Sequence, residues 1–326
     1  MEHVRIIGCG KAAGEQKITN KDLENIVETS DEWITTRTGI RSRYISSSRN
    51  TSDLAIEAAA NAIQSAGINP HDIRLIIVAT LTPDCVTPSV ACMVQAALGL
   101  NEDNIMAFDL NAACSGFLFA LQTASSLLQE GYGLVIGAET LSKILNWEDR
   151  STCVLFGDGA GACVIERDEN ASMTFYARSS GDTAHALYCG SRSLQKDMHN
   201  VKEDKQYLEM NGREVFRFAT RAMPDAIHAV MQDDDIDTID LIIPHQANQR
   251  ILDYVSKKMK IPMEKMVINL DEFGNTSSAS VPIALAAAWE EGRIHDNMTI
   301  VLVGFGAGFT WGACRIETGG KQNDDQ

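Results

Sequence analysis

Short apolar runs alternate with longer amphipathic segments along most of the chain, which indicates strands and helices in turn. The apolar runs are rich in β-branched residues and end at glycine, polar or loop residues, so they predict buried strands. These strands are expected at residues 4–10, 74–82, 104–111, 133–139, 238–244 and 298–306. Apolar positions at helical spacing predict helices at residues 52–67, 88–99, 213–232, 249–260 and 277–292, and another directly after Cys114.

Residues at the ends of these segments refine the prediction. Ser52 is the expected N-cap of the first long helix, and Gly67 is its expected stop. Pro224 is expected to kink or break the helix at residues 213–232. Residues 151–166, STCVLFGDGAGACVIE, are interpreted as two short strands around a glycine turn.

Strands that alternate with helices predict a layered α/β architecture. The sequences FGDGAGACVIE and GFGAGFTWGACRIE suggest that each half of the chain ends in the same way. We therefore predict two related halves, residues 1–168 and 169–326. Residues 185–207 form the one long polar stretch, interpreted as a surface loop, and the polar tail 319–326 is expected to be disordered.

Charge and hydropathy exclude several classes of protein. The 326 residues carry a formal net charge of −16, which argues against general nucleic-acid binding and against a membrane-surface role. No apolar run reaches the roughly 18 residues that a membrane span needs. The N-terminus, MEHVRIIGCG, is typical of a first strand rather than of a signal peptide, so we expect a cytoplasmic protein.

The eight cysteines do not indicate a metal site or a disulfide framework, because no two are spaced as C-x-x-C. We expect roughly six or seven of the eight to be small buried hydrophobes. Cys114 is the candidate exception, since it lies at the start of a predicted helix, where the helix dipole favours a thiolate. An inert buried thiol is an equally reasonable interpretation of its position alone.

Three further loops begin where an apolar strand stops. His245 follows the strand IDLII, Asn275 follows a glycine in EFGNTSSASVP, and glycines 304, 306 and 308 follow IVLV. Ligand sites lie at such strand ends in α/β proteins. Each loop also has an ordinary structural explanation, as a core histidine, a turn asparagine or a glycine turn. The glycine spacing is not the dinucleotide fingerprint, so no nicotinamide cofactor is expected.

The chain carries Cys114, His245, Asn275 and the glycine turn in this order. Together with the sequence around each of them, this order resembles the β-ketoacyl-acyl-carrier-protein synthase III family. The similar segments are TSDEWITTRTGIRSRY, PSVACMVQAALG, NAACSGF, DRSTCVLFGDGAGA, PHQANQRI, GNTSSASVPIAL and GFGAGFTWG. They span nearly the whole chain, so chance similarity is excluded.

This resemblance implies a thiolase fold with duplicated halves in a five-layered αβαβα arrangement, and a homodimer. It implies an acyltransferase that condenses an acyl-CoA primer, typically acetyl-CoA, with malonyl-acyl carrier protein. The product is a 3-oxoacyl-carrier protein, at the first step of fatty-acid synthesis, and no cofactor or metal takes part.

The resemblance also implies roles for single residues. Cys114 would hold the acyl group, and His245 and Asn275 would donate hydrogen bonds to the enolate of the extender. The backbone N–H groups of Cys114 and Ala307 would form the oxyanion hole, although many relatives have glycine at the position of Ala307. The residues that match the CoA-binding positions are Trp33, Arg37, Arg150 and Asn248.

Two basic stripes stand out on this acidic chain, independently of the resemblance. Arg213, Arg217 and Arg221 recur every four residues, and Arg250, Lys257 and Lys258 share a second helix face. They suit an acidic carrier protein and the phosphate of its prosthetic arm. Ordinary helix solvation is the alternative explanation.

The residue before Pro88 bounds the acyl pocket in relatives, some of which carry phenylalanine there for short primers. Thr87 is smaller, which suggests a pocket that accepts primers longer than acetyl.

Two other functions remain open. A related enzyme of secondary metabolism or polyketide starter loading would share the Cys-His-Asn set. A non-catalytic protein that binds acyl-CoA or a carrier protein would not need all three residues. A degradative thiolase is disfavoured, because such enzymes need a second catalytic cysteine, and Cys314 lies beyond the glycine turn.

Overall fold

The computed structural model describes residues 2–182, 184–191 and 206–319. Its first half contains strands β1 (Val4–Ala13), β2 (Gln16–Thr19), β3 (Ser42–Ile45), β4 (Ile73–Ala79), β5 (Met106–Leu110), β6 (Tyr132–Thr140) and β7 (Asp158–Arg167). Its helices are α1 (Asn20–Leu23), α2 (Asp31–Thr38), α3 (Thr51–Ala66), α4 (Val90–Ala97) and α5 (Gly116–Leu127).

The second half contains strands β8 (Ser172–Ser179), β9 (Leu187–Cys189), β10 (Leu208–Met210), β11 (Leu241–Pro244), β12 (Thr299–Gly306) and β13 (Thr310–Glu317). Its helices are α6 (Gly212–Met231), α7 (Gln249–Met259), α8 (Leu270–Phe273) and α9 (Ser280–Glu290). The boundary predicted between residues 168 and 169 lies in the connection from β7 to β8.

The two main sheets repeat one strand order. The first is β1-β7-β6-β4-β5, with β4 parallel to both β5 and β6 and the other pairs antiparallel. The second is β8-β13-β12-β11, with β11 parallel to β12 and the other pairs antiparallel. A single parallel bridge from Ile242 to Met266 takes the place of a fifth strand beside β11. The chain therefore folds the same βα pattern twice.

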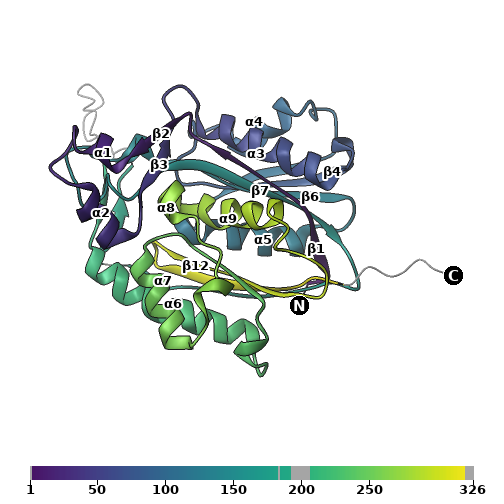
Figure 1. The fold of residues 1–326 in the computed structure, drawn as a ribbon. Helices are drawn as coiled ribbons and strands as arrows, with labels where there is room; N and C mark the ends of the chain where they lie inside the picture. The colour runs from purple at the N-terminus through teal and green to yellow at the C-terminus, as the bar shows by residue number, and fades with distance from the viewer. Residues whose placement is uncertain (1, 183, 192–205, 320–326) are drawn as a thin grey trace.

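The helices and strands lie in layers (Figure 1), and the three largest buried apolar clusters join these layers. Helices α5 and α9 share one core with both sheets, so they form the middle layer. Helices α3 and α4 pack on the outer face of the first sheet, and α6 and α7 pack on the outer face of the second. The five-layered αβαβα arrangement expected from the resemblance is confirmed.

Composition explains why the layers pack closely. Half of the buried residues of α3 are alanine, which forms helices readily and lets the helix axis approach β1 and β7. Strand β4 is almost completely buried, as its continuous apolar run predicts for a strand covered on both faces.

Some details of the predicted elements were wrong. Helix α3 begins after Asn50, whose backbone N–H donates to the Asp53 carboxylate at 2.7 Å, rather than after Ser52. Residues 151–166 contain one strand, β7, because residues 151–155 form turns instead. Helix α6 continues through Pro224 without a break. The stop at Gly67 is confirmed, with a left-handed φ of 65°.

Two insertions form small two-stranded sheets of their own, apart from the two main sheets. Between β1 and α3 the chain forms β2, α1, α2 and β3, and β2 pairs antiparallel with β3. Between β8 and α6 it forms the β9–β10 pair. Most of the long loop expected at residues 185–207 and nearly all of the tail expected at 319–326 lie outside the described residues.

Candidate active site

Cys114 lies in a short 3₁₀ turn, Ala113–Ser115, that leads directly into α5. The turn follows β5, so the end of a buried strand and the start of a middle-layer helix fix the position of the thiol. Ala113 has a φ of 48°, an unfavourable left-handed conformation for a residue with a Cβ atom. Backbone strain of this kind is frequent at functional sites.

The environment of the Cys114 thiol is largely apolar. Burial raises its pKa to about 12, and the buried Glu139 carboxyl adds to the rise, while the Ser277 hydroxyl acts in the opposite direction. The N-terminus of α5 also favours the thiolate through its dipole. The Cys114 sulfur is therefore a thiol at rest. A group that donates a hydrogen bond to this sulfur would stabilise the reactive thiolate.

His245 directly follows β11, and its backbone N–H donates to the carbonyl of Val303 on β12. The imidazole is 1% exposed and contacts the Phe305 ring edge to face. Burial lowers the pKa of His245 to about 3, so the ring is neutral at physiological pH. A neutral imidazole can donate one hydrogen bond without becoming a cation.

Asn275 is held by its backbone and by its side chain. Its N–H donates to Leu155, and its carbonyl accepts from Gly157. Its carboxamide oxygen accepts from the Ser277 N–H at 2.9 Å, and its NH₂ group has no acceptor among the described residues, so it can donate to a ligand. Gly274 precedes it with a φ of 66°, and a Cβ atom there would lie 2.9 Å from the Leu155 carbonyl.

The glycine turn between β12 and β13 lies against Cys114. A Cβ atom on Gly306 would lie 2.6 Å from the Cys114 backbone nitrogen, so only glycine fits. The Thr310 hydroxyl lies within hydrogen-bond distance of the carbonyls of Ala112 and Ala307, at 2.9 and 3.0 Å, and can donate its one proton to either. It therefore links the backbone that carries the two expected oxyanion donors.

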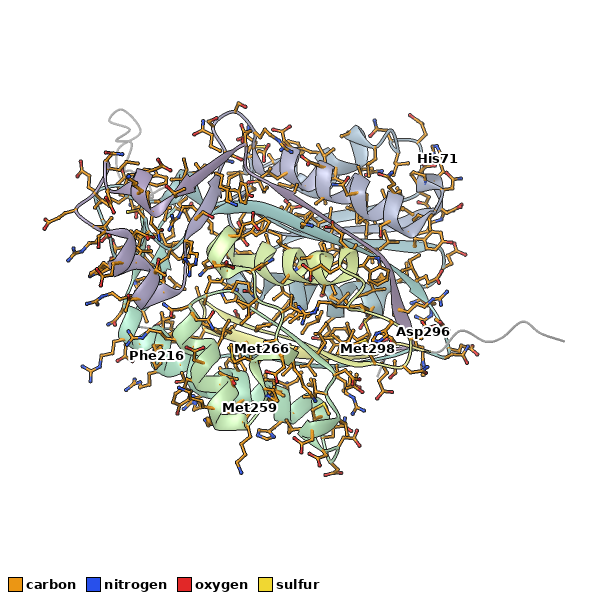
Figure 2. The ribbon with its side chains drawn as sticks, in the orientation of Figure 1. His71, Phe216, Met259, Met266, Asp296 and Met298 are labelled. Atoms are coloured by element: carbon orange, nitrogen blue, oxygen red, sulfur yellow. The ribbon has the colours of Figure 1, made fainter. Side chains whose placement is uncertain are left out.

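One narrow cavity of about 110 Å³ brings the three expected catalytic residues together. It is lined by Cys114, His245 and Asn275, with Phe305 and Gly306 beside them. A wider cavity of about 920 Å³ opens to the surface. The residues that line both cavities are Leu155, Met210, Gly212, Phe216 and Asn248. Figure 2 labels Phe216 at the end of α6 nearest to α2.

All four expected CoA-binding residues line the outer cavity, namely Trp33, Arg37, Arg150 and Asn248. Both guanidinium groups lie over the Trp33 ring, Arg37 at 4.7 Å and Arg150 at 4.9 Å from its centroid. Arg150 is also anchored to the Glu28 carbonyl at 3.0 Å. The site therefore combines a flat aromatic ring with two positive charges, each within 4.9 Å of the ring centroid.

Asn248, the fourth expected CoA-binding residue, lies at the junction of the two cavities. Its carboxamide oxygen caps α7 by accepting from the Arg250 N–H, and its NH₂ group donates to the Arg37 carbonyl at 3.2 Å. It therefore joins α7 to α2 in addition to lining the channel.

The six basic residues expected to bind a carrier protein fall into three groups. Arg213, Arg250 and Lys257 line the mouth of the outer cavity. Arg217 and Arg221 line a separate hollow beside Phe309 and Trp311, and Arg217 pairs with Glu214 there. Lys258 donates to the Thr220 carbonyl at 3.3 Å.

Thr87 is exposed and does not line the cavity that contains Cys114. Its neighbours Cys85 and Val86 line a further hollow that also reaches Ala113 and Ala307. Within one chain, the structure therefore does not bring Thr87 to the thiol.

Sequence reasoning missed Ser277, Thr310 and Glu139, which lie around the site but have no motif of their own. It also overestimated the burial of the cysteines: Cys85 and Cys92 are exposed, and Cys189 is half-buried. In the part of the chain that the structure describes, no His, Cys, Asp and Glu side chains cluster as a metal site would require. None of the described helices is long and apolar enough to cross a membrane.

Comparisons with known proteins agree with this geometry. The 3-oxoacyl-[acyl-carrier-protein] synthase III family model matches residues 108–183, and the model of its C-terminal part matches residues 231–318. β-Ketoacyl-[acyl-carrier-protein] synthase III of Clostridium perfringens (strain SM101 / Type A) is 49% identical over 325 residues, which cover 97% of this chain and 100% of the relative.

Solved structures give the same result. The crystal structure of 3-oxoacyl-[acyl-carrier-protein] synthase III from Aquifex aeolicus VF5 is 42% identical with a TM-score of 0.89, covering 96% of this chain and 99% of that one. The priming β-ketosynthase of the R1128 polyketide pathway is 31% identical with a TM-score of 0.88, covering 98% and 97%. The chain therefore belongs to the 3-oxoacyl-[acyl-carrier-protein] synthase III family and has the thiolase fold.

Proposed function

We propose that this protein condenses an acyl-CoA primer with malonyl-acyl carrier protein, and so initiates fatty-acid synthesis. The observation that carries the proposal is the convergence of Cys114, His245 and Asn275 on one buried cavity. Two residues from the second half of the chain meet the nucleophile of the first half there. This is the set that a thiol acylation followed by a decarboxylative condensation needs.

In the first half-reaction, the Cys114 sulfur attacks the primer thioester, and the bond from the acyl carbon to CoA sulfur breaks. The oxyanion that forms would be stabilised by the backbone N–H groups of Cys114 and Ala307. Thr310 supports this role, because its hydroxyl holds the two backbone segments together. CoA leaves as the thiol with the proton that the Cys114 thiol releases.

In the second half-reaction, malonyl-acyl carrier protein loses carbon dioxide, and the electron pair of the broken C–C bond forms an enolate. The neutral His245 ring and the Asn275 NH₂ group would donate hydrogen bonds to the enolate oxygen. The enolate carbon then attacks the acyl-Cys114 thioester and expels the sulfur. The electrons come from the carboxylate that leaves, so the reaction as proposed uses no cofactor.

We propose that the CoA adenine stacks on Trp33 beside Arg150. Arg150 lies 4.9 Å from the ring centroid, whereas a flat ring inserted between them would need about 7 Å, two stacking distances. Arg150 would therefore move outward when CoA binds, and the pantetheine arm would pass Asn248 toward Cys114.

We propose a homodimer and an acidic carrier protein as partners. Arg213, Arg250 and Lys257 are the preferred contacts of the carrier protein, because they surround the mouth of the channel. The fully exposed side chain of Val86, next to Thr87, is an apolar group that a second subunit would cover. Thr87 would bound an acyl pocket only across such an interface.

Intact-mass measurement after incubation with acetyl-, butyryl- and octanoyl-CoA tests the nucleophile. We expect a gain of one acyl group in the wild type and none in Cys114→Ala. Adding malonyl-acyl carrier protein should then release a 3-oxoacyl product. If no primer gives an adduct, the proposed reaction is wrong and the binding-protein alternative is favoured.

The second candidate function is the loading of a polyketide starter. The R1128 priming β-ketosynthase supports it, because that enzyme shares the fold over nearly the whole chain. Exclusive acylation by a primer other than acetyl-CoA would favour this alternative. Exclusive use of acetyl-CoA would instead contradict the roomier pocket expected from Thr87.

A further inference from the structure

The two halves of the chain place the same strained turn before each middle-layer helix. Ala113 has a φ of 48° and Ser277 a φ of 50°, and each starts a 3₁₀ turn that continues into α5 or α9. The residue after each is Cys114 in the first half and Ser278 in the second. Ser278 is thus the counterpart of the nucleophile.

The two turns are in contact, and the second is firmly anchored. A Cβ atom on Gly116 would lie 3.4 Å from the Ser278 Cβ atom. The Ser278 hydroxyl donates to the Glu139 carboxyl at 2.7 Å and lies 2.9 Å from the Ala79 carbonyl. The Ser277 N–H donates to Asn275 at 2.9 Å. The backbone of Ser277 is therefore held in place from both sides.

The Ser277 side chain has no such partner. The residue is 1% exposed, and its hydroxyl makes no hydrogen bond to any residue that the structure describes. The turn that carries Ser277 packs against the turn that carries Cys114, and the Ser277 side chain acts to lower the pKa of that thiol. A buried hydroxyl without a partner is unfavourable, and so is a left-handed φ at a residue with a Cβ atom. Glycine would avoid both costs at this position.

We propose that the Ser277 hydroxyl donates a hydrogen bond to the Cys114 sulfur whenever that sulfur carries negative charge. It is then a further catalytic residue, which acts when the thiol attacks the primer and when condensation expels the sulfur. In the second step the C–S bond breaks, its electron pair stays on sulfur, and the Ser277 proton remains on oxygen. The role in turnover depends on the proposed condensation, whereas the contact with the sulfur does not.

Alkylation of Cys114 by iodoacetamide tests the contact without any substrate. We would compare wild type with Ser277→Ala and Ser277→Gly between pH 7 and 10, using intact mass to follow the single modification at Cys114. A hydrogen bond to a charged group corresponds to roughly tenfold or more in thiolate population. We expect both variants to react about tenfold more slowly than wild type at each pH.

The two variants separate the hydroxyl from the backbone. Glycine relieves the strained φ and alanine does not, so an effect of strain would differ between them, whereas loss of the hydroxyl affects both. Ser115→Ala is the matched control, because its hydroxyl is also buried without a partner among the described residues and immediately follows Cys114. We expect that control to react at the wild-type rate.

Rates within twofold of wild type for both Ser277 variants would overturn the proposal. An equal loss in Ser115→Ala would also overturn it, because the effect would then be general. If both Ser277 variants are alkylated more slowly as expected but no acyl-CoA modifies the wild type, the proposed reaction fails while the Ser277 contact stands.

Discussion

The Asn275 carboxamide oxygen accepts a hydrogen bond from the backbone N–H of Ser277 at 2.9 Å. This one contact decides which way the amide faces, because the oxygen is occupied and the NH₂ group has no acceptor in the part of the chain that the structure describes. Asn275 is therefore built as a donor, as stabilisation of an enolate requires.

Asn275→Asp keeps the accepting oxygen and removes the NH₂ donor. We expect decarboxylation of malonyl-acyl carrier protein to fall by about 100-fold or more, the usual effect of losing one such donor. Acylation of Cys114 should change only a few-fold, since Asn275 acts in the second half-reaction. Intact mass and carbon dioxide release measure the two steps separately. Equal losses in both steps would contradict this division of roles.

Gly306→Ala should disable the nucleophile. The added methyl group would lie 2.6 Å from the Cys114 nitrogen and 3.0 Å from its Cβ atom. We expect loss of acylation, with destabilisation of about 1–3 kcal/mol from overpacking. Gly304→Ala is the control, because its nearest neighbour is the flexible end of Leu118 at 3.3 Å. Acylation by Gly306→Ala at the wild-type rate would refute the close approach.

His245 should make the fold sensitive to mild acid. Burial lowers its pKa to about 3, whereas an unfolded histidine titrates near 6.5. Below pH 6.5 the histidine of the unfolded chain therefore binds a proton that the folded chain does not bind. The free energy of unfolding decreases as the pH is lowered. Between pH 7.5 and 5.5 this linkage removes about 1.4 kcal/mol.

Between pH 7.5 and 5.5, the free energy of unfolding of His245→Phe should decrease by about 1.4 kcal/mol less than that of the wild type. Urea denaturation of both proteins at the two pH values measures the difference, and the other titrating groups cancel in the comparison. An identical loss in both proteins would mean that the folded histidine binds protons normally.

Arg150→Ala should raise KM for acetyl-CoA about three- to tenfold, the range expected for one cation–π contact. Acetyl-pantetheine lacks the adenine, so its KM should not change. Arg178→Ala is the control, because Arg178 also lies over an aromatic ring, Tyr176 at 4.5 Å, but lines neither cavity. An equal rise with both thioesters would place the adenine elsewhere.

Arg213→Glu and Arg250→Glu should raise KM for malonyl-acyl carrier protein by tenfold or more at low salt, and less at high salt. Arg221→Glu should have a small effect, because Arg221 lines the separate hollow beside Phe309. A larger effect of Arg221→Glu than of the other two variants would indicate that the carrier protein does not bind at the channel mouth.

The sequence was sufficient for the larger features because they depend on local patterns. The alternation of strands and helices follows from hydrophobic periodicity, and Cys114, His245 and Asn275 each lie at the end of such an element. Cys85 and Cys92 were misplaced because burial depends on which faces the fold covers, and a small apolar residue fits either side.

Ser277 and Glu139 could not be found in this way. The importance of Ser277 comes from its contact with a turn more than 160 residues earlier in the chain, and serine is common in turns. Glu139 has the pattern of the last polar residue of a strand, yet it is completely buried and accepts hydrogen bonds from Thr82 and Ser278. Only the three-dimensional structure reveals both.

The middle layer of α5 and α9 has a consequence for how the protein loses activity. Both helices share one core with both sheets, so neither half of the chain can keep its apolar surface covered without the other. Separately expressed halves should therefore be insoluble or unfolded until they are mixed. Cys114 comes from one half of the chain, and His245 and Asn275 come from the other. Enzyme activity would therefore report directly on the association of two such fragments.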